Sequence, residues 1–230
     1  MVNNKLEILN NIAYFAKCKK AAIKQMSVFL IPLDDEHSAL MNISYNAYFT
    51  YWIGLVDYLI SISFMEKKDI INLVESEDNY YYIRNLRNSV VHRAENLANK
   101  GTVIENTNVF VPFSPVNITD QSKGKKYQPF SKYLIDIVII CERINSLCLS
   151  IINQHDLTNY SDDTKEEFVN TLKNNQYLAP ELKRNEIYEF SWQYYFNNKD
   201  EMKQDNVKRI LSYFDTEHLI NMIIKKETIS

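Results

Sequence analysis

The stretch MNISYNAYFTYWIGLVDYLISI, residues 41–62, decides the fold. Large apolar side chains recur in it at alternating steps of four and three residues, at Met41, Tyr45, Tyr48, Trp52, Leu55, Leu59 and Ile62. Such steps place the side chains on one face of an α-helix. The acidic residues Asp34, Asp35 and Glu36 come just before, where negative charge favours a helix N-terminus. The stretch therefore predicts a long helix that packs against neighbours along one face.

Two further segments show the same steps. The first ends at Pro32 and is interrupted only by Lys19; its apolar positions are Ile8, Ile12, Phe15, Ala22, Met26 and Phe29. The second runs from about Ser131 to Gln154, with apolar positions at Leu134, Ile137, Cys141, Ile144, Cys148 and Ile151. Sustained steps of three and four are typical of helices packed nearly parallel or antiparallel. We expect an up-and-down helical bundle.

The composition agrees with a mainly α-helical protein. A chain of 230 residues that is 46% hydrophobic can bury one sizeable core. With only three glycines and five prolines, it has too few turn residues for a many-stranded sandwich or barrel. The net charge of −3 argues against a general nucleic-acid coat, but a local phosphate site needs only a few cations.

A reducing, cytoplasmic location is expected, with no membrane partner. The three cysteines are odd in number and lie at apolar helical positions, not in a paired metal spacing. The first residues lack the basic start and apolar run of a signal peptide. The most apolar stretch, residues 52–64, is interrupted by Asp57 and falls short of the roughly 20 residues that a bilayer span requires.

The sequence suggests a bundle over residues 1–158 and a helical appendix over 159–230. A fourth core helix is expected at about 78–98, with Gly101 just beyond its end. Residues 102–130 interrupt the helical pattern as an insertion: TVIENTNVFVPF predicts two short strands, the only β-structure expected, followed by a loop. The appendix predicts shorter helices, beginning near Pro180 and lying around 207–214 and 218–225.

The fourth helix contains LRNSVVHRAENL, residues 86–97, which gathers two arginines, two asparagines, a histidine and a glutamate. On a helical wheel one stripe is apolar and consists of Ile83, Leu86, Val90, Ala94 and Leu97. The other side is a polar band of Arg84, Asn88, His92 and Glu95, with Arg87 at its boundary. A solvated helix face would have this composition. Val91, however, lies inside the band, which favours a face that packs against another surface.

Residues 87–92, RNSVVH, resemble the Arg-x4-His motif of the HEPN (higher eukaryotes and prokaryotes nucleotide-binding) superfamily. Asn88 fits the polar residue that often follows the arginine in that family. The resemblance covers about residues 1–158. It implies an up-and-down helical bundle, with a site formed where two motifs meet across a homodimer interface. It also implies RNA cleavage without a metal or cofactor.

The resemblance assigns roles to individual residues. The ribose 2′-hydroxyl attacks the adjacent phosphate, leaving a 2′,3′-cyclic phosphate; His92 exchanges protons near neutral pH and Arg87 offers a planar fork to the phosphate oxygens. Asn88, one turn before His92, orients the imidazole or the substrate. Arg84 and Glu95 are supporting candidates, although an ordinary intrahelical pair also explains Glu95.

Weaker candidates lie outside the motif. Tyr80 and Tyr81 have the side chains for base stacking, and Lys123, Lys125 and Lys126 for contacts to a phosphate backbone, so all five are substrate-binding candidates; the sequence nevertheless favours packing tyrosines and a solvated basic loop. Residues 34–37, DDEH, contain metal-ligand types, yet consecutive residues at a helix start point in different directions. No metal site is expected.

Two functions from different classes remain. The first is a metal-independent endoribonuclease with RNA as substrate, acting as a toxin or phage-defence effector, with an antitoxin protein as a further partner. The second is a non-catalytic HEPN-like module that binds a nucleotide or a protein through the same face. The intact motif favours the first.

Overall fold

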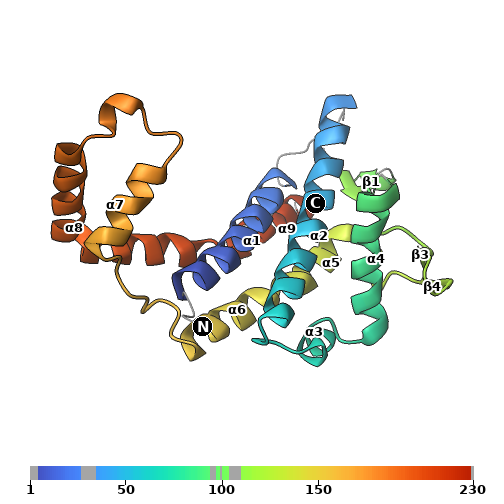
Figure 1. The fold of residues 1–230 in the computed structure, drawn as a ribbon. Coiled ribbons are helices and arrows are strands. Elements are labelled where there is room, and N and C mark those ends of the chain that lie inside the picture. Colours follow the sequence, from blue (N-terminus) through green and yellow to red (C-terminus); the bar gives the residue numbers. More distant parts are fainter. Residues whose placement is uncertain (1–4, 27–34, 94–96, 99, 104–109, 229–230) are drawn as a thin grey trace.

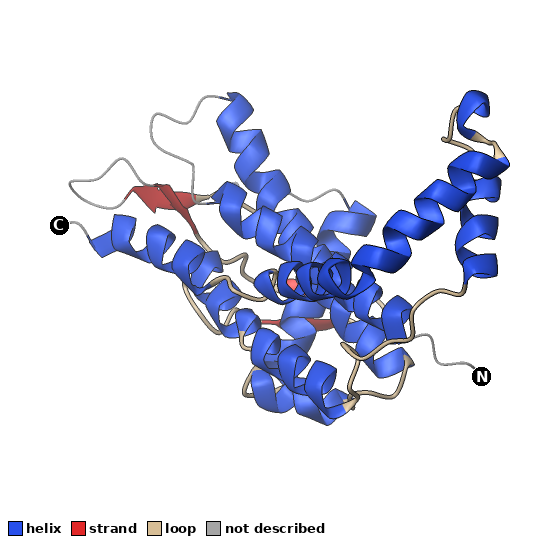
Figure 2. Ribbon diagram, turned by 90° about the vertical axis from the view of Figure 1, so that its left-hand side faces the viewer, coloured by secondary structure: helices blue, strands red, loops and turns tan. Residues whose placement is uncertain are grey.

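The computed structural model describes residues 5–26, 35–93, 97–98, 100–103 and 110–228 (Figure 1). The described part is mainly α-helical, with two small antiparallel two-stranded sheets, so the expected fold class is confirmed. Figure 2 shows the strands as minor additions to a helical body. Within the same ranges, no helix combines the length and the apolar character needed to cross a membrane.

The centre of the bundle is a pair of long helices, α1 (Lys5–Met26) and α2 (Asp35–Ser61), which pack along each other. The predicted face of α2 is buried, at Met41, Tyr45, Tyr48, Trp52, Leu55 and Leu59. On α1 the apolar positions Ile12, Ala22 and Met26 are buried as well. The predicted extension of the first helix to Phe29 and Pro32 lies outside the described residues.

The predicted third long helix is divided. It consists of α5 (Leu134–Glu142) and α6 (Ile144–Gln154), and its six apolar positions are all buried. Arg143 separates the two with helical torsions of −55° and −22°, and its N–H bonds to the Ile140 carbonyl three residues back. Just before this break, the Trp52 indole donates a 2.8 Å hydrogen bond to the Cys141 carbonyl. The expected single helix is thus wrong at one point only.

The insertion begins with the predicted hairpin. Strands β1 (Gly101–Val103) and β2 (Phe110–Pro112) pair antiparallel, with Thr102 opposite Val111. Gly101, which was expected beyond the end of the fourth helix, is the first residue of β1. A Cβ atom there would meet the Val111 carbonyl oxygen and the Phe110 ring, so the absence of a side chain permits the close pairing of the strands.

A second hairpin contradicts the expectation that the rest of the insertion is a loop. Strands β3 (Ile118–Asp120) and β4 (Lys125–Tyr127) pair antiparallel beyond the predicted limit of β-structure. In the turn, the Asp120 carboxylate accepts hydrogen bonds from the N–H groups of Ser122 and Lys123. Gly124 follows with a φ of +64°, a conformation that glycine adopts without strain. Side-chain capping therefore closes a hairpin whose strands are only three residues long.

The short helix α3 (Lys67–Leu73) leads from α2 to α4 (Glu77–Arg93), which carries the motif and packs on α2 and on the β3–β4 hairpin. In Figure 1, α4 and the hairpins lie on the opposite side of the bundle from α7. The bundle thus places α4 at its edge, between α2 and the insertion.

The C-terminal part contains α7 (Lys165–Asn174), a 3₁₀ turn (Pro180–Leu182), α8 (Asn185–Ser212) and α9 (Glu217–Thr228). The expected separate helix at 207–214 is wrong, because that segment ends the 28-residue α8. The bundle core also contains side chains from the last turn of α8, from the turn that follows it and from α9, namely Ile210, Phe214, Leu219, Ile220 and Ile223. The boundary at residue 158 stays a prediction.

A buried polar cluster joins the C-terminal part to the bundle. Lys19, which interrupts the apolar stripe of α1, forms an ion pair with Glu142 and donates a 2.8 Å hydrogen bond to Asn145. The Tyr48 hydroxyl donates to one oxygen of Glu142 at 2.8 Å, and the Thr216 hydroxyl to the other at 2.6 Å. All five residues are buried, so each charge is matched and hydrogen-bonded within the core.

Candidate functional site

The buried face of α4 is broader than its apolar stripe. Ile83 and Leu86 are buried as predicted, but so are Asn85 and Ser89. Both polar side chains turn back to their own helix: the Asn85 amide donates to the Tyr81 carbonyl and the Ser89 hydroxyl to the Asn85 carbonyl. This local bonding lets small polar groups occupy a packed face at little cost. The buried face of α4 therefore includes two polar positions, Asn85 and Ser89, that belong to neither the apolar stripe nor the polar band.

Arg87 and Asn88 lie together at the edge of the buried face, and both are partly buried. A guanidinium N–H of Arg87 donates to the Asn88 side-chain oxygen at 3.2 Å. The Nε of Arg87 is buried and has no hydrogen-bond partner among the described residues. A buried donor without a partner is costly, and functional sites are one place where proteins keep such groups.

Val91 is 47% exposed, although its helix, α4, packs on both α2 and the β3–β4 hairpin. His92 follows it in the last turn of α4; its backbone is helical, while its side chain and the whole of Glu95 lie outside the described residues. Helical spacing puts residue 92 one turn beyond Asn88 on the same face. The backbone therefore allows Asn88 and His92 to act as neighbours.

Arg84 is already engaged by other parts of the fold. Its guanidinium donates to the Asp57 carboxylate of α2 at 2.7 Å and to the Tyr80 hydroxyl at 3.2 Å. The side chains of Arg84 and Asp57 are 37% and 47% exposed. An arginine held by a carboxylate from the neighbouring helix has an adequate structural role, and its charge is largely neutralised.

The five substrate-binding candidates fall into different environments. Tyr80 is 4% exposed, so its ring has no free face for a base. Lys125 and Lys126 of β4 are both exposed, and Lys125 is paired with Asp78 at 2.7 Å. Tyr81 and Lys123 come together, with the Lys123 ammonium 4.5 Å from the centre of the Tyr81 ring. Among the contacts of the described residues, only this pair brings a predicted tyrosine and a predicted lysine together.

Sequence reasoning missed Lys67 of α3. Its ammonium donates 2.8 Å hydrogen bonds to the Tyr81 hydroxyl and to Glu77, and it also lies 4.5 Å from the centre of the Tyr81 ring. The hydrogen bond from Lys67 lowers the pKa of Tyr81. No sequence signal marks the contact, because it depends on the turn between α3 and α4.

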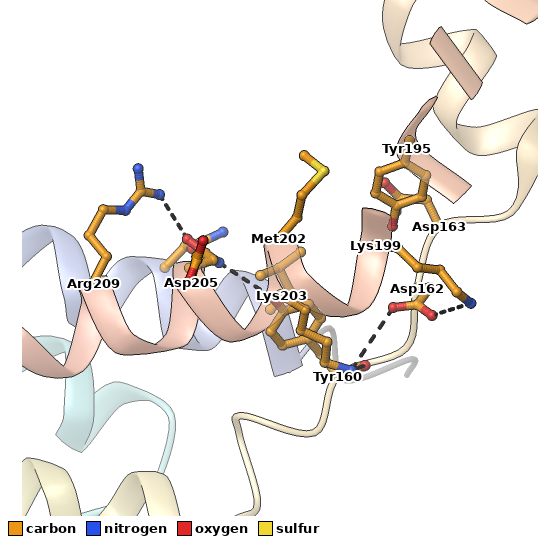
Figure 3. A pocket seen from close by; sticks show the side chains of 12 residues that line it. Tyr160, Asp162, Asp163, Tyr195, Lys199, Met202, Lys203, Asp205 and Arg209 are labelled. Atoms are coloured by element: carbon orange, nitrogen blue, oxygen red, sulfur yellow. Dashed lines mark hydrogen bonds and ion pairs between the residues drawn. The ribbon is translucent and has the colours of Figure 1, made fainter. Parts of the chain in front are cut away.

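A pocket of about 610 Å³ lies elsewhere, between α1, α8 and the segment before α7 (Figure 3). Its lysines are engaged: Lys199 pairs with Asp162 at 2.8 Å, and Lys203 donates to the Tyr160 carbonyl. Acidic and basic side chains both line the pocket, so its walls favour neither an anionic nor a cationic ligand. None of the residues predicted for the site lines it.

Comparison with known proteins gives no relative: no family model, no curated protein and no solved structure matches this chain.

Proposed function

We propose that the chain is a HEPN-like endoribonuclease that cleaves RNA without a metal ion or a cofactor. One observation carries the proposal: Arg87 lies against Asn88, and its buried Nε has no hydrogen-bond partner among the described residues. The same helix continues to the exposed Val91 and to His92. The face thus contains a cation that stays charged at all physiological pH values, an amide beside it and a surface that is free to meet another molecule.

The proposed reaction is an intramolecular transesterification at phosphorus. The ribose 2′-oxygen bonds to the adjacent phosphorus and loses its proton, the bond from phosphorus to the 5′-oxygen breaks, and that oxygen gains a proton. The products are a 2′,3′-cyclic phosphate and a 5′-hydroxyl end. His92 exchanges these protons near neutral pH. Arg87 stabilises the additional negative charge on the phosphoryl oxygens, which is the electrostatic task that a metal performs in other nucleases.

A homodimer through α4 completes the proposed site. Val91 supplies an exposed apolar contact within a polar face, and a twofold axis passing near it would bring two copies of Arg87 and His92 together. Glu95 remains a supporting candidate on the sequence alone. Arg84 takes part through the ion pair that holds α4 against α2.

The biological role that we propose is that of a cytoplasmic toxin or phage-defence effector, restrained by an antitoxin protein. The family resemblance suggests this role. The cysteines Cys18, Cys141 and Cys148 are free, which suits a reducing compartment.

The test is cleavage of total RNA in excess chelator by the wild-type protein and by three variants at equal folded concentration. His92→Ala should lose most of the activity, by about 10²–10⁴-fold. Arg87→Lys keeps the charge but not the planar fork, so it should also be severely impaired. Asn88→Ala should be milder. Activity that needs a divalent metal, or that is unchanged in His92→Ala, would remove the mechanism.

The second candidate is a non-catalytic HEPN-like module that binds a nucleotide or a protein. The pairing of Arg84 with Asp57 favours it, because a binding face tolerates a neutralised cation better than a phosphoryl-transfer site does. This candidate predicts that RNA is bound and recovered intact. End analysis of the RNA by mass spectrometry separates the two functions.

A further inference from the structure

Two lysine side chains from different elements converge on Tyr81. Lys67 comes from α3 and Lys123 from the turn of the β3–β4 hairpin, and each ammonium lies 4.5 Å from the centre of the Tyr81 ring. The two ammonium groups therefore cannot be further apart than twice that distance. An anion that binds beside the Tyr81 ring would therefore be attracted by both ammonium groups. In Figure 1, α3 and the hairpin lie on the same side of the bundle as α4.

Lys67, Tyr81 and Lys123 form a surface cluster. The acidic groups nearby do not occupy all of its N–H donors. Glu77 accepts one hydrogen bond from Lys67, and Asp78 is occupied by Lys125. An ammonium has three N–H groups, so Lys67, which donates to Glu77 and Tyr81, has one left. In the described ranges, no carboxylate forms an ion pair with Lys123, although the charge of Lys123 contributes to the lowered pKa of Asp120 in the same turn. The cluster therefore offers several N–H donors to an incoming anion.

The hairpin that carries Lys123 is fixed to α4. Tyr127 of β4 is 3% exposed and stacks on Tyr81 with ring centres 5.7 Å apart. Lys125 pairs with Asp78 in the first turn of α4. The Asp120 carboxylate then holds the turn through the N–H groups of Ser122 and Lys123. The position of the second ammonium thus follows from packing on α4 and from a capped turn, unlike that of a lysine on a free loop.

The cluster lies in line with the proposed catalytic residues. Tyr81 and Asn88 are two helical turns apart on one face of α4, which is about 10 Å along the axis. Arg84 lies between them, held by Asp57. A single-stranded RNA that follows this face would bring phosphates to both places. The Tyr81 ring, flanked by two ammonium groups, is less suited to base stacking than the sequence suggested.

We propose that Lys67, Tyr81 and Lys123 form a subsite for a backbone phosphate of single-stranded RNA, separate from the phosphate that is cleaved. The identity of the ligand rests on the proposed ribonuclease function. The subsite gives the β3–β4 hairpin a role: it supplies the second cation and makes the binding of a long strand stronger than that of a dinucleotide, which has a single phosphate.

The test is fluorescence anisotropy with a labelled 12-nucleotide 2′-O-methyl RNA, which lacks the attacking hydroxyl and stays intact. The wild-type protein is compared with Lys123→Ala and with Lys67→Ala/Lys123→Ala. The control is Lys68→Ala, which removes an exposed lysine of α3 that is paired with Glu66. Melting curves followed by circular dichroism verify that each variant folds; Lys123 lies in an exposed turn, so its variant stays informative if the double variant unfolds.

The double variant should bind the 12-mer several-fold more weakly, and the slope of log affinity against log salt should become shallower by about 0.7, as for one lost phosphate contact in a single strand. Lys123→Ala should show part of both changes, and Lys68→Ala neither. Equal losses in Lys68→Ala, or none in the lysine variants, would overturn the subsite. Calorimetric titration that shows tighter binding of inorganic phosphate or ATP than of the 12-mer would overturn the RNA assignment.

The subsite and the ribonuclease activity can fail independently. If RNA is never cleaved but the 12-mer binds with the expected dependence on Lys67 and Lys123, only the catalytic proposal falls. If RNA is cleaved and the lysine variants bind the 12-mer as the wild type does, only the subsite falls.

Discussion

Arg84 and Asp57 join the motif helix to the centre of the bundle: a guanidinium N–H of α4 lies 2.7 Å from a carboxylate oxygen of α2. The same arginine also donates to the Tyr80 hydroxyl one turn earlier in α4. The sequence suggested Arg84 as a supporting residue of the site. In the structure it fixes the orientation of α4, the helix that carries Arg87 and His92.

This pairing gives the first prediction. Arg84→Met and Asp57→Asn each break the same ion pair, so both should reduce stability by a similar and small amount, about 0.5–1 kcal/mol for a partly exposed pair. They should also reduce RNA cleavage equally, because Arg84 acts through the position of α4. Urea denaturation and the cleavage assay measure the two effects. A much larger loss of cleavage in Arg84→Met than in Asp57→Asn would show that Arg84 contacts the RNA.

The second prediction concerns the proposed dimer. Val91→Asp places a charge at the centre of the expected interface and should convert a dimer to a monomer at micromolar concentration, because burying an unpaired carboxylate is costly. Val116→Asp is the matched control, since Val116 is 69% exposed and lies outside α4. Light scattering coupled to size-exclusion chromatography gives the mass. A wild-type protein that is already monomeric would rule out the interface.

The third prediction concerns the buried ion pair. Lys19→Met leaves the Glu142 carboxylate buried without its cation, so the free energy of unfolding should fall by about 3–5 kcal/mol. Lys17→Met, on the exposed side of the same helix, should change it little. Adding Glu142→Leu to Lys19→Met should recover much of the loss, because no buried charge remains. Urea denaturation of the variants measures this; an additive second loss would contradict it.

The fourth prediction is a dependence of stability on pH. Burial alone would raise the pKa of Glu142, but Lys19, Thr216 and Tyr48 more than offset this, so its pKa is lowered from 4.5. A depressed carboxylate contributes stability that is fully present above its unfolded pKa and is lost as the pH falls through its folded pKa. Wild-type stability should therefore decline below about pH 4.5 more steeply than that of Glu142→Gln. Parallel declines in urea titrations of the two proteins would contradict it.

The helical framework could be predicted because it depends on a pattern within each segment. Trp52, Leu55 and Leu59 recur at helical steps, and burial of that face is what the hydrophobic effect favours for such a stripe. The break at Arg143 could not be predicted in this way, because the apolar positions continue without a shift across it. The hydrogen bond from the Trp52 indole to the Cys141 carbonyl, just before the break, depends on tertiary packing.

The second hairpin was missed for a different reason. Strands of three residues are too short to show a periodic pattern, and Lys125 and Lys126 have little preference for a strand. The hairpin forms because Tyr127 packs on Tyr81 and the Asp120 carboxylate caps the turn. Both contacts become visible only once α4 and the hairpin are placed together.

The candidate site was predictable in its order along the helix but not in the partners of its residues. The sequence placed Arg84, Arg87 and Asn88 on one side of α4, and the structure agrees. It did not indicate that Asp57 would neutralise Arg84 or that Lys67 would approach Tyr81. Each of these depends on a neighbouring element that no local pattern identifies.

The polar cluster around Glu142 also imposes an order in time. Two of its hydrogen-bond partners, Thr216 and the Phe214 carbonyl, come about 70 residues later in the chain, since Thr216 is 74 residues beyond Glu142. At a synthesis rate of about 5–20 residues per second, the ribosome needs roughly 4–15 s to add that segment. Throughout that interval the nascent bundle contains a carboxylate and an amide whose last partners have not yet been made. The core is therefore completed only after Phe214 and Thr216 have been added to the chain.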